Sequence, residues 1–269
     1  MTAMTPMTAA GSTSEQAALA TTLAGRLADA RSSRQAVPSL SDEHPGLDLA
    51  TGYAVQRIQR DSGGPLVGWK LGVTSRAKQQ QVGVHEPIRG FLSSDHALDL
   101  GEPLRVDAHI QPRTEPEIVF IMGRDLAGPS VTAADVLAAT GAVAAGIEVL
   151  DSRFLDYRFT MPDVVADDAS AGRFVVGAPV PLAGIDLRLV GVVLEKNGEV
   201  VGTASGAASL GHPAAAVAWL VRSLAADGEG LLAGQVILSG GLTAAVPVSG
   251  GDCVVVTIDR MGSVELACV

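Results

Sequence analysis

Aromatic side chains make up only 3 % of this 269-residue sequence, and it contains just two cysteines, Cys253 and Cys268. Because large rings are so scarce, the core of a chain this long has to be built mainly from Val, Ala, Leu and Ile. Neither cysteine stands in a CxxC or Cys/His pattern. We therefore interpret both as small core residues of a reducing compartment, and not as a disulfide or a zinc site.

Basic residues are also in deficit, with 19 Lys and Arg against 29 Asp and Glu and a formal net charge of −10. Without a basic run the chain lacks the clustered charge that binds nucleic acid. No apolar run approaches the roughly 18–20 residues of a membrane span. The stretch Met1–Ser14 has neither the charged start nor the apolar centre of a signal peptide. We expect a cytoplasmic protein that binds neither nucleic acid nor membrane.

What the chain does contain is 47 % hydrophobic residues and 31 glycines, a composition typical of a β-rich globular enzyme. We expect disorder over residues 1–13, a helical or mixed N-terminal region over 14–100 and a β-rich catalytic domain over 101–269. Hydrophobic periodicity predicts five helices: Ser14–Ala36, Leu49–Arg60, Arg76–Gln81, Val131–Thr140 and Pro213–Ala226.

Short apolar runs bounded by Gly and Pro predict the strands: Val67–Val73, Arg113–Met122, Ala142–Leu150, Val190–Glu195, Val200–Thr203, Val236–Ser239, Cys253–Asp259 and Val264–Val269. Asn197-Gly198, between two of these runs, predicts a hairpin turn. Pro116 cannot donate to a ladder, so it indicates an edge strand or a local break in the pairing. No GxGxxG follows a strand, which excludes a dinucleotide-binding fold.

Three carboxylates are the most informative polar residues. In an extended Arg113–Met122 segment, Glu115 and Glu117 project from the same face. Glu148 lies in a strand that is otherwise apolar, where a charge needs a partner or a metal. Three carboxylates are hard ligands suited to Mg²⁺ or Mn²⁺. The spacing alone equally allows a solvated strand face, with Glu148 paired to an arginine such as Arg153.

Several motifs in a fixed order separate these two interpretations. They are Gly68-Trp-Lys-Leu-Gly-Val-Thr-Ser75, Pro87-Ile-Arg-Gly-Phe-Leu92, Glu115-Pro-Glu117, Glu148-Val-Leu-Asp-Ser-Arg153, Val164-Val-Ala-Asp-Asp-Ala-Ser170, Gly211-His-Pro213 and Gly240-Gly-Leu-Thr243. Together they resemble the hydratase/decarboxylase branch of the fumarylacetoacetate hydrolase superfamily. The resemblance extends from about Leu47 to the C-terminus. It implies an α+β fold, a mixed β-sandwich roll with a small α/β N-terminal region.

The resemblance also implies the composition of the site. Glu115, Glu117 and Glu148 would hold Mg²⁺ or Mn²⁺, and Lys70 would be the catalytic lysine. The substrate would be a small 2-oxo acid, and the enzyme would be a homo-oligomer able to associate with a hydratase or decarboxylase of the same pathway. The residues expected to contact the substrate are Leu71, Arg89, Ser170, Gly240, Gly241 and Thr243.

Within this branch the motifs favour metal-dependent decarboxylation of 2-oxo-3-hexenedioate, with hydration of 2-hydroxypenta-2,4-dienoate as the alternative. Hydratases typically carry an Asp where this chain has Ile88. Decarboxylases generally have Tyr where this chain has Arg89, which could pair with a distal carboxylate or indicate a different substrate. Asp168 replaces the usual Asn, and its role is open.

Two readings from other classes complete the set of hypotheses. An acylpyruvase-type C–C hydrolase would share the metal site, but its usual His–Glu dyad has no counterpart among the motifs. A non-catalytic partner subunit is the other alternative, and the intact glutamates and Lys70 argue against it.

Overall fold

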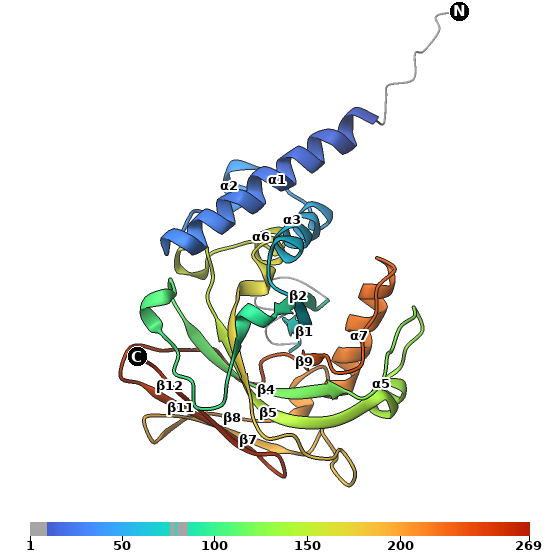
Figure 1. Cartoon of the computed structure of the whole chain (residues 1–269), viewed down its shortest axis with the longest axis vertical. Coiled ribbons are helices and arrows are strands. Elements are labelled where there is room, and N and C mark those ends of the chain that lie inside the picture. Colours follow the sequence, from blue (N-terminus) through green and yellow to red (C-terminus); the bar gives the residue numbers. More distant parts are fainter. Residues whose placement is uncertain (1–9, 76–78, 80–85) are drawn as a thin grey trace, which may run out of the picture.

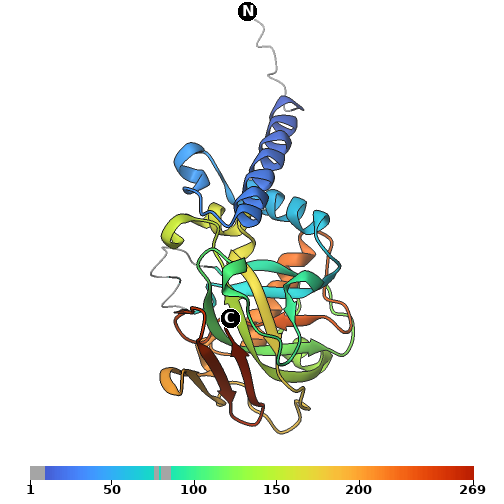
Figure 2. The same ribbon diagram turned by 60° about the vertical axis from the view of Figure 1, so that its left-hand side comes forward.

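The computed structural model describes residues 10–75, 79 and 86–269. In this part of the chain two β-sheets pack against each other, and a group of helices covers one end of them (Figures 1 and 2). The helix expected over Arg76–Gln81 lies, apart from Gln79, outside the described residues. None of the described helices is long and apolar enough to span a membrane.

The helical end is formed by segments from the N-terminus and from the middle of the chain. Leu23 and Leu27 of α1 pack with Val55 of α3 and with Phe154 in a small core of their own. Asp48 caps α3 by accepting a hydrogen bond from the Thr51 amide at 2.8 Å. The helices of this layer are α1 (Ala10–Ser33), α2 (Leu40–Glu43), α3 (Leu49–Ser62) and α6 (Met161–Ala166).

The larger sheet has eight strands, with the order β2-β1-β9-β4-β5-β6-β3 and with β10 paired to β4. Its central strands are almost fully buried, which agrees with their long apolar segments Ile118–Met122 and Ala142–Ile147. The strands are β1 (Leu66–Gly72), β2 (Ile88–Ser93), β3 (Ala97–Leu98), β4 (Arg113–Met122), β5 (Thr140–Leu150), β6 (Ala171–Val176), β9 (Val236–Leu238) and β10 (Val246–Pro247).

The smaller sheet has the order β12-β11-β7-β8 and packs one face into the main core. Alternate residues of β11, from Val254 to Ile258, are buried, as expected for a strand with one solvated face. Asn197 and Gly198 both have positive φ, 55° and 81°, and form the predicted hairpin turn. The strands are β7 (Gly191–Lys196), β8 (Glu199–Ser205), β11 (Cys253–Ile258) and β12 (Gly262–Ala267).

Two helices pack beside the large sheet, α5 (Ala133–Ala139) and α7 (Pro213–Ala225). Leu220 of α7 is fully buried and Trp219 is half-buried against the main core. His212 caps α7 by accepting from the Ala214 amide at 3.0 Å. Five 3-10 turns complete the described structure: η1 (Ser94–His96), η2 (Val106–Ala108), η3 (Leu155–Tyr157), η4 (Asp168–Ser170) and η5 (Gly206–Ala208).

Pro116 does not mark an edge strand, because β4 lies in the interior of the large sheet between β5 and β9. On the side away from β5, β10 pairs with β4 up to Thr114, and β9 pairs from Val119 onward. Pro116 falls in the gap between these two pairings, so the predicted local break is correct. The large sheet also includes β1 and β2, which precede residue 101, while the division of the chain there stays a prediction.

Candidate metal centre

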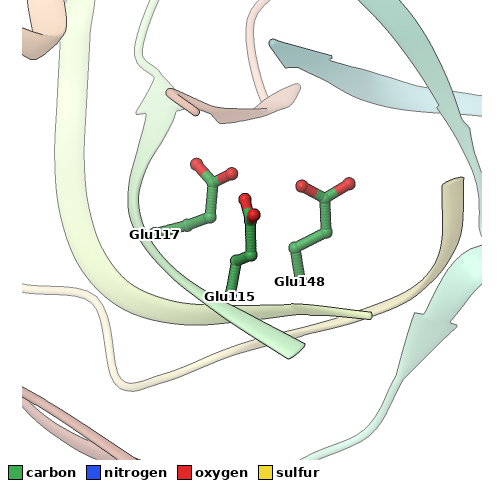
Figure 3. A group of neighbouring side chains, drawn as sticks. All are labelled: Glu115, Glu117 and Glu148. Atoms are coloured by element: carbon green, nitrogen blue, oxygen red, sulfur yellow. The ribbon is translucent and has the colours of Figure 1, made fainter. Parts of the chain in front are cut away.

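The site is built on the antiparallel pair β4 and β5. Glu115 is directly opposite Glu148, and Glu117 is opposite Gly146. Since side chains alternate along a strand, Glu115 and Glu117 lie on one face of β4, and Glu148 projects from the same face of β5. Figure 3 shows the three side chains pointing the same way, with their carboxylates gathered at one place.

The three carboxylates are close together and removed from water. Each offers an oxygen, and these three oxygens lie within 4.8 Å of one another. The exposed fractions are 6 % for Glu115, 0 % for Glu117 and 2 % for Glu148. Like charges at this spacing, without water around them, repel strongly unless a cation lies among them. The prediction that the three residues converge is confirmed.

The electrostatics of Glu117 agree with a metal-binding role. Burial, followed by the charges of Glu148 and Glu115, raises its pKa well above the ordinary value. Its Oε2 atom accepts a hydrogen bond from the Gly240 amide at 2.5 Å, whereas Oε1 has no hydrogen-bond partner among the described residues. An orphaned, buried carboxylate oxygen beside two further carboxylates is the donor set of a hard divalent cation. These residues therefore fit Mg²⁺ or Mn²⁺.

Lys70 lies on β1, and its side chain reaches the three carboxylates. Its side chain is 1 % exposed, and the ammonium group forms an ion pair with Glu148 and donates to the Ala169 carbonyl at 2.5 Å. Burial raises the pKa of Glu148, and Lys70 partly offsets that effect. The alternative that Glu148 pairs with Arg153 is wrong, because Arg153 forms its ion pair with Asp167.

The lysine is held by a strained turn. Asp168, Ala169 and Ser170 all have φ between 50° and 58°, a conformation that non-glycine residues rarely adopt. The turn directs the Ala169 carbonyl at Lys70, and the Ser170 hydroxyl donates to Asp167 at 3.4 Å. Asp168 accepts from the Phe91 amide at 2.8 Å, and burial raises its pKa to about 7. Asp168 thus holds the turn against β2.

The Gly240-Gly241 segment closes the site from the other side of β4. Gly240 has φ of 104°, and a Cβ there would lie 1.9 Å from Thr74 Oγ1, so this position requires glycine. Gly241 lines the cavity described below. Thr243 points elsewhere, since its side chain lies against Gly202 of β8. Its hydroxyl donates to the Ala244 carbonyl at 3.0 Å. The structure thus places the glycines at the site and the threonine outside it.

A cavity of about 410 Å³ opens beside the carboxylates and is lined by Lys70, Glu115, Glu148 and Ser170 together with apolar side chains. Leu71, whose side chain packs in the main core, also borders it. The sequence analysis did not identify some of the residues that line the cavity. Arg113 could have been found, since it shares the strand alternation of Glu115, whereas nothing local in the sequence indicates the others. These missed lining residues are Arg113, Tyr157 and Phe159.

Arg89 is not brought to this cavity. Its guanidinium group forms an ion pair with Asp227, donates to Ser223 at 2.9 Å and lies over the ring of Tyr53 at 4.8 Å. The physical reason is the pleat of β2. Arg89 is paired with Leu71 and shares its face, while the next residue, Gly90, is paired with Lys70 and shares the face of the site.

Comparison with known proteins agrees with this architecture. The family model described as Fumarylacetoacetate (FAA) hydrolase C-terminal matches residues 68–268. The chain belongs to this family. Among curated relatives, a 4-oxalocrotonate decarboxylase from Pseudomonas sp. (strain CF600) is 43 % identical over 234 residues, which cover 85 % of this chain and 89 % of the relative. A 2-hydroxyhexa-2,4-dienoate hydratase from Comamonas testosteroni is 40 % identical over 248 residues, covering 90 % and 94 %.

Solved structures of the family show the same fold. The 4-oxalocrotonate decarboxylase from Pseudomonas putida G7, complexed with magnesium and adipate, superposes with a TM-score of 0.89 at 39 % identity. The match covers 93 % of this chain and 97 % of the other. The same enzyme complexed with calcium and acetate gives a TM-score of 0.88. The expected α+β fold of the fumarylacetoacetate hydrolase type is therefore confirmed.

Proposed function

We propose that this protein is a divalent-metal-dependent decarboxylase that converts 2-oxo-3-hexenedioate (4-oxalocrotonate) to 2-hydroxypenta-2,4-dienoate and CO₂. The observation that carries the proposal is the cluster of three buried carboxylates beside a buried lysine, because Lys70, Glu115 and Glu148 of this group line one cavity. The decarboxylases among the relatives, at 43 % and 39 % identity, support the choice of reaction. Magnesium in the solved decarboxylase supports the choice of metal.

Each group of the site has a defined part in this reaction. When bound by Glu115, Glu117 and Glu148, a divalent cation supplies Lewis-acid stabilisation of negative charge on the substrate's C2 oxygen. The C5–C6 bond breaks, CO₂ leaves, and the electron pair passes through the conjugated chain to that oxygen. Lys70 holds a proton on Nζ inside the cavity and transfers it to the C2 oxygen, which completes the enol product.

Decarboxylation is favoured over hydration by the wall of the cavity. Addition of water at C4 requires a group that activates water, and hydratases typically have an Asp at the position of Ile88. Here the apolar Ile88 side chain lines the cavity, and Glu115 and Glu148 are the only carboxylates among its described lining residues. Both belong to the three carboxylates that would bind the metal, so neither is available to activate a water molecule at C4.

The proposal is tested by adding Mg²⁺ or Mn²⁺ to the metal-free protein and following 4-oxalocrotonate by its absorbance. We expect metal-dependent loss of substrate with formation of CO₂ and the dienol. Glu117→Gln should lower the rate at least roughly 100-fold, because the cation loses a direct ligand. Glu199→Gln, which removes an exposed carboxylate at the start of β8, is the matched control and should leave the rate unchanged.

The same assay separates the alternatives. Metal-dependent hydration of 2-hydroxypenta-2,4-dienoate without CO₂ release would assign the protein to the hydratases, which are also present among relatives at 40 % identity. Cleavage of an acylpyruvate would indicate a C–C hydrolase. Failure to turn over any of these substrates in the metal-loaded state would contradict the catalytic proposal and favour a partner subunit.

We further infer a small 2-oxo acid as ligand, a homo-oligomeric assembly and a cytoplasmic location. The two free cysteines support a reducing compartment. Association with the hydratase of the following step belongs to the same proposal. Size-exclusion chromatography with light scattering, alone and with a hydratase of the family, measures both kinds of association.

A further inference from the structure

Arg113, the first residue of β4, is a cation at the site. Neither the family motifs nor the three metal-binding carboxylates assign it a role. It is directly opposite Leu150, and it shares the face of β4 from which Glu115 and Glu117 project. Its half-buried side chain lines the same cavity. Lys70 and Arg113 are the basic residues among the described lining of this cavity, and Lys70 is already engaged with Glu148.

The guanidinium group of Arg113 is held in place without being neutralised. It lies 3.9 Å from the centre of the Tyr157 ring, which fixes it by a cation–π contact. Within the described part of the chain, Arg113 makes no ion pair and its side chain donates no hydrogen bond. Its five N–H donors remain available to a ligand in the cavity.

The ring beneath the guanidinium is rigidly placed. Tyr157 and the preceding Asp156 both have positive φ, 58° and 55°, which costs free energy and indicates a constrained backbone. The Tyr157 hydroxyl donates to the Gln111 carbonyl at 3.1 Å, and its ring packs against that of Phe159 at 6.4 Å. The strained turn therefore places an aromatic platform for a cation at the cavity.

The spacing along β4 matches a ligand with two charged ends. Two residues of extended strand separate Arg113 from Glu115 by about 7 Å, comparable to the length of an extended six-carbon chain. The cavity that Arg113 shares with Glu115 and Glu148 is otherwise lined largely by apolar side chains, which suit a hydrocarbon chain. They include Ile88, Leu150, Phe159, Val164 and Ala169.

We propose that Arg113 binds the distal carboxylate of a dicarboxylic 2-oxo acid and thereby selects dicarboxylic over monocarboxylic substrates. The inference rests on the proposed function for the position of the 2-oxo end at the metal cluster. A planar guanidinium group matches the geometry of a carboxylate through two parallel hydrogen bonds. Arg113 would thus bind the distal carboxylate, the role that the sequence analysis considered for Arg89.

The reaction gives this contact a kinetic signature. The distal carboxylate leaves as neutral CO₂, so its ion pair with Arg113 is stronger in the bound substrate than in the transition state. An interaction of that kind lowers KM without raising kcat. Arg113→Gln should raise KM for 4-oxalocrotonate roughly ten- to hundredfold, the effect of losing a charge-assisted hydrogen bond, and change kcat less than KM.

A binding experiment tests the proposal independently of turnover. Mg²⁺-loaded protein is titrated calorimetrically with 2-oxohexanedioate and with 2-oxohexanoate, which differ only in the distal carboxylate. We expect wild type to prefer the diacid by roughly ten- to hundredfold. Arg113→Gln should abolish this preference and leave the affinity for 2-oxohexanoate unchanged, and Arg113→Lys should restore part of it. Arg105→Gln, on an arginine whose side chain is 71 % exposed, is the charge-matched control.

The outcomes are distinct. A preference for the diacid that disappears only in the Arg113 variant supports the proposal, even if the protein does not decarboxylate 4-oxalocrotonate. A preference that survives in Arg113→Gln, or no preference in wild type, overturns it. Equal weakening of both ligands, with an unchanged melting temperature, also overturns it, because Arg113 would then act on the 2-oxo end.

Discussion

The pairing of Lys70 with Glu148 is the residue-scale feature on which the chemistry depends. Both residues are almost completely buried, 1 % and 2 % exposed, so each charge relies on the other for compensation. Because Glu148 is also a metal ligand in our account, Lys70 has two effects. It carries a proton at the substrate, and its charge opposes the rise in the pKa of Glu148 that burial causes.

Replacing Lys70 with Met, which retains the side-chain length but removes the charge, tests both effects. We expect kcat to fall by roughly 10²–10⁴ at saturating Mg²⁺, because the proton donor is lost. The metal-free protein should lose about 3–5 kcal/mol of unfolding free energy, because Glu148 is left as a buried, uncompensated charge.

Lys196→Met is the matched control for this variant, since Lys196 forms an ion pair with Asp252 near the surface of the small sheet. It should change the unfolding free energy by no more than about 1 kcal/mol and leave kcat unchanged. Rates come from the 4-oxalocrotonate assay and stabilities from urea unfolding. Wild-type activity in Lys70→Met would remove this residue from the reaction.

Single residues of the site were predictable to different degrees. Strand alternation alone placed Glu115 and Glu117 on one face, and the motif order supplied Glu148 and Lys70. Arg89 was misassigned because its direction depends on the pairing of β1 with β2, a contact that the local sequence does not contain. Arg113 was missed although its alternation with Glu115 was visible.

At the scale of elements, the loop after β9 is as important as the strands. The Gly240 amide donates to Glu117, and this contact depends on a backbone conformation with φ of 104°. Gly240 therefore links the end of β9 to the metal cluster on β4. A side chain at this position would displace the loop, the amide donor or Thr74.

Gly240→Ala should weaken Mg²⁺ binding and lower the unfolding free energy by about 1–3 kcal/mol. The new Cβ would combine backbone strain with a clash. Gly251→Ala is the control, because Gly251 has a similar φ of 94° but nothing within 4 Å of the position of its Cβ. Gly251→Ala should lower the unfolding free energy through backbone strain and leave the affinity for Mg²⁺ unchanged. Equal Mg²⁺ affinity in both variants would contradict the role given to Gly240. Calorimetry and urea unfolding provide the two measurements.

Elements with strong local signals were predicted well, and the others were not. The Asn197-Gly198 turn and the helix after Pro213 form where the sequence indicates, because their geometry is set by the residues themselves. The strands β2 and β6 and the helix α6 were not predicted as elements. The two strands pair with the preceding strands β1 and β5 across long connections, and α6 packs against α3, so contacts outside the local sequence decide their structure.

At the scale of the whole molecule, the fold brings together residues from four regions of the chain. Parallel pairing of β1 with β9 places Lys70 beside Leu238, close to Gly240. Antiparallel pairing of β4 with β5 places Glu115 opposite Glu148. Composition and periodicity cannot provide these long-range pairings, and only the motif order, through the family, indicated them in advance.

The assembled cluster makes the stability of the metal-free protein depend on pH. The folded-state pKa of Glu117 is raised well above its ordinary value of 4.5, so between these two values the folded protein binds more protons than the unfolded chain. Its contribution to stability is therefore complete below pH 4.5 and is lost as the pH rises through the raised pKa. A bound cation reverses this loss, and its binding displaces a proton.

The most direct test of the account is calorimetric titration of the metal-free protein with Mn²⁺ at several pH values, in buffers of different ionisation enthalpy. We predict one ion per chain, proton release on binding, and an affinity that rises with pH until Glu117 is fully ionised. In Glu117→Gln the affinity should fall by more than roughly tenfold and the proton release should diminish. Absence of binding to wild type, or binding that is unchanged in Glu117→Gln, would contradict a metal centre built from these three carboxylates.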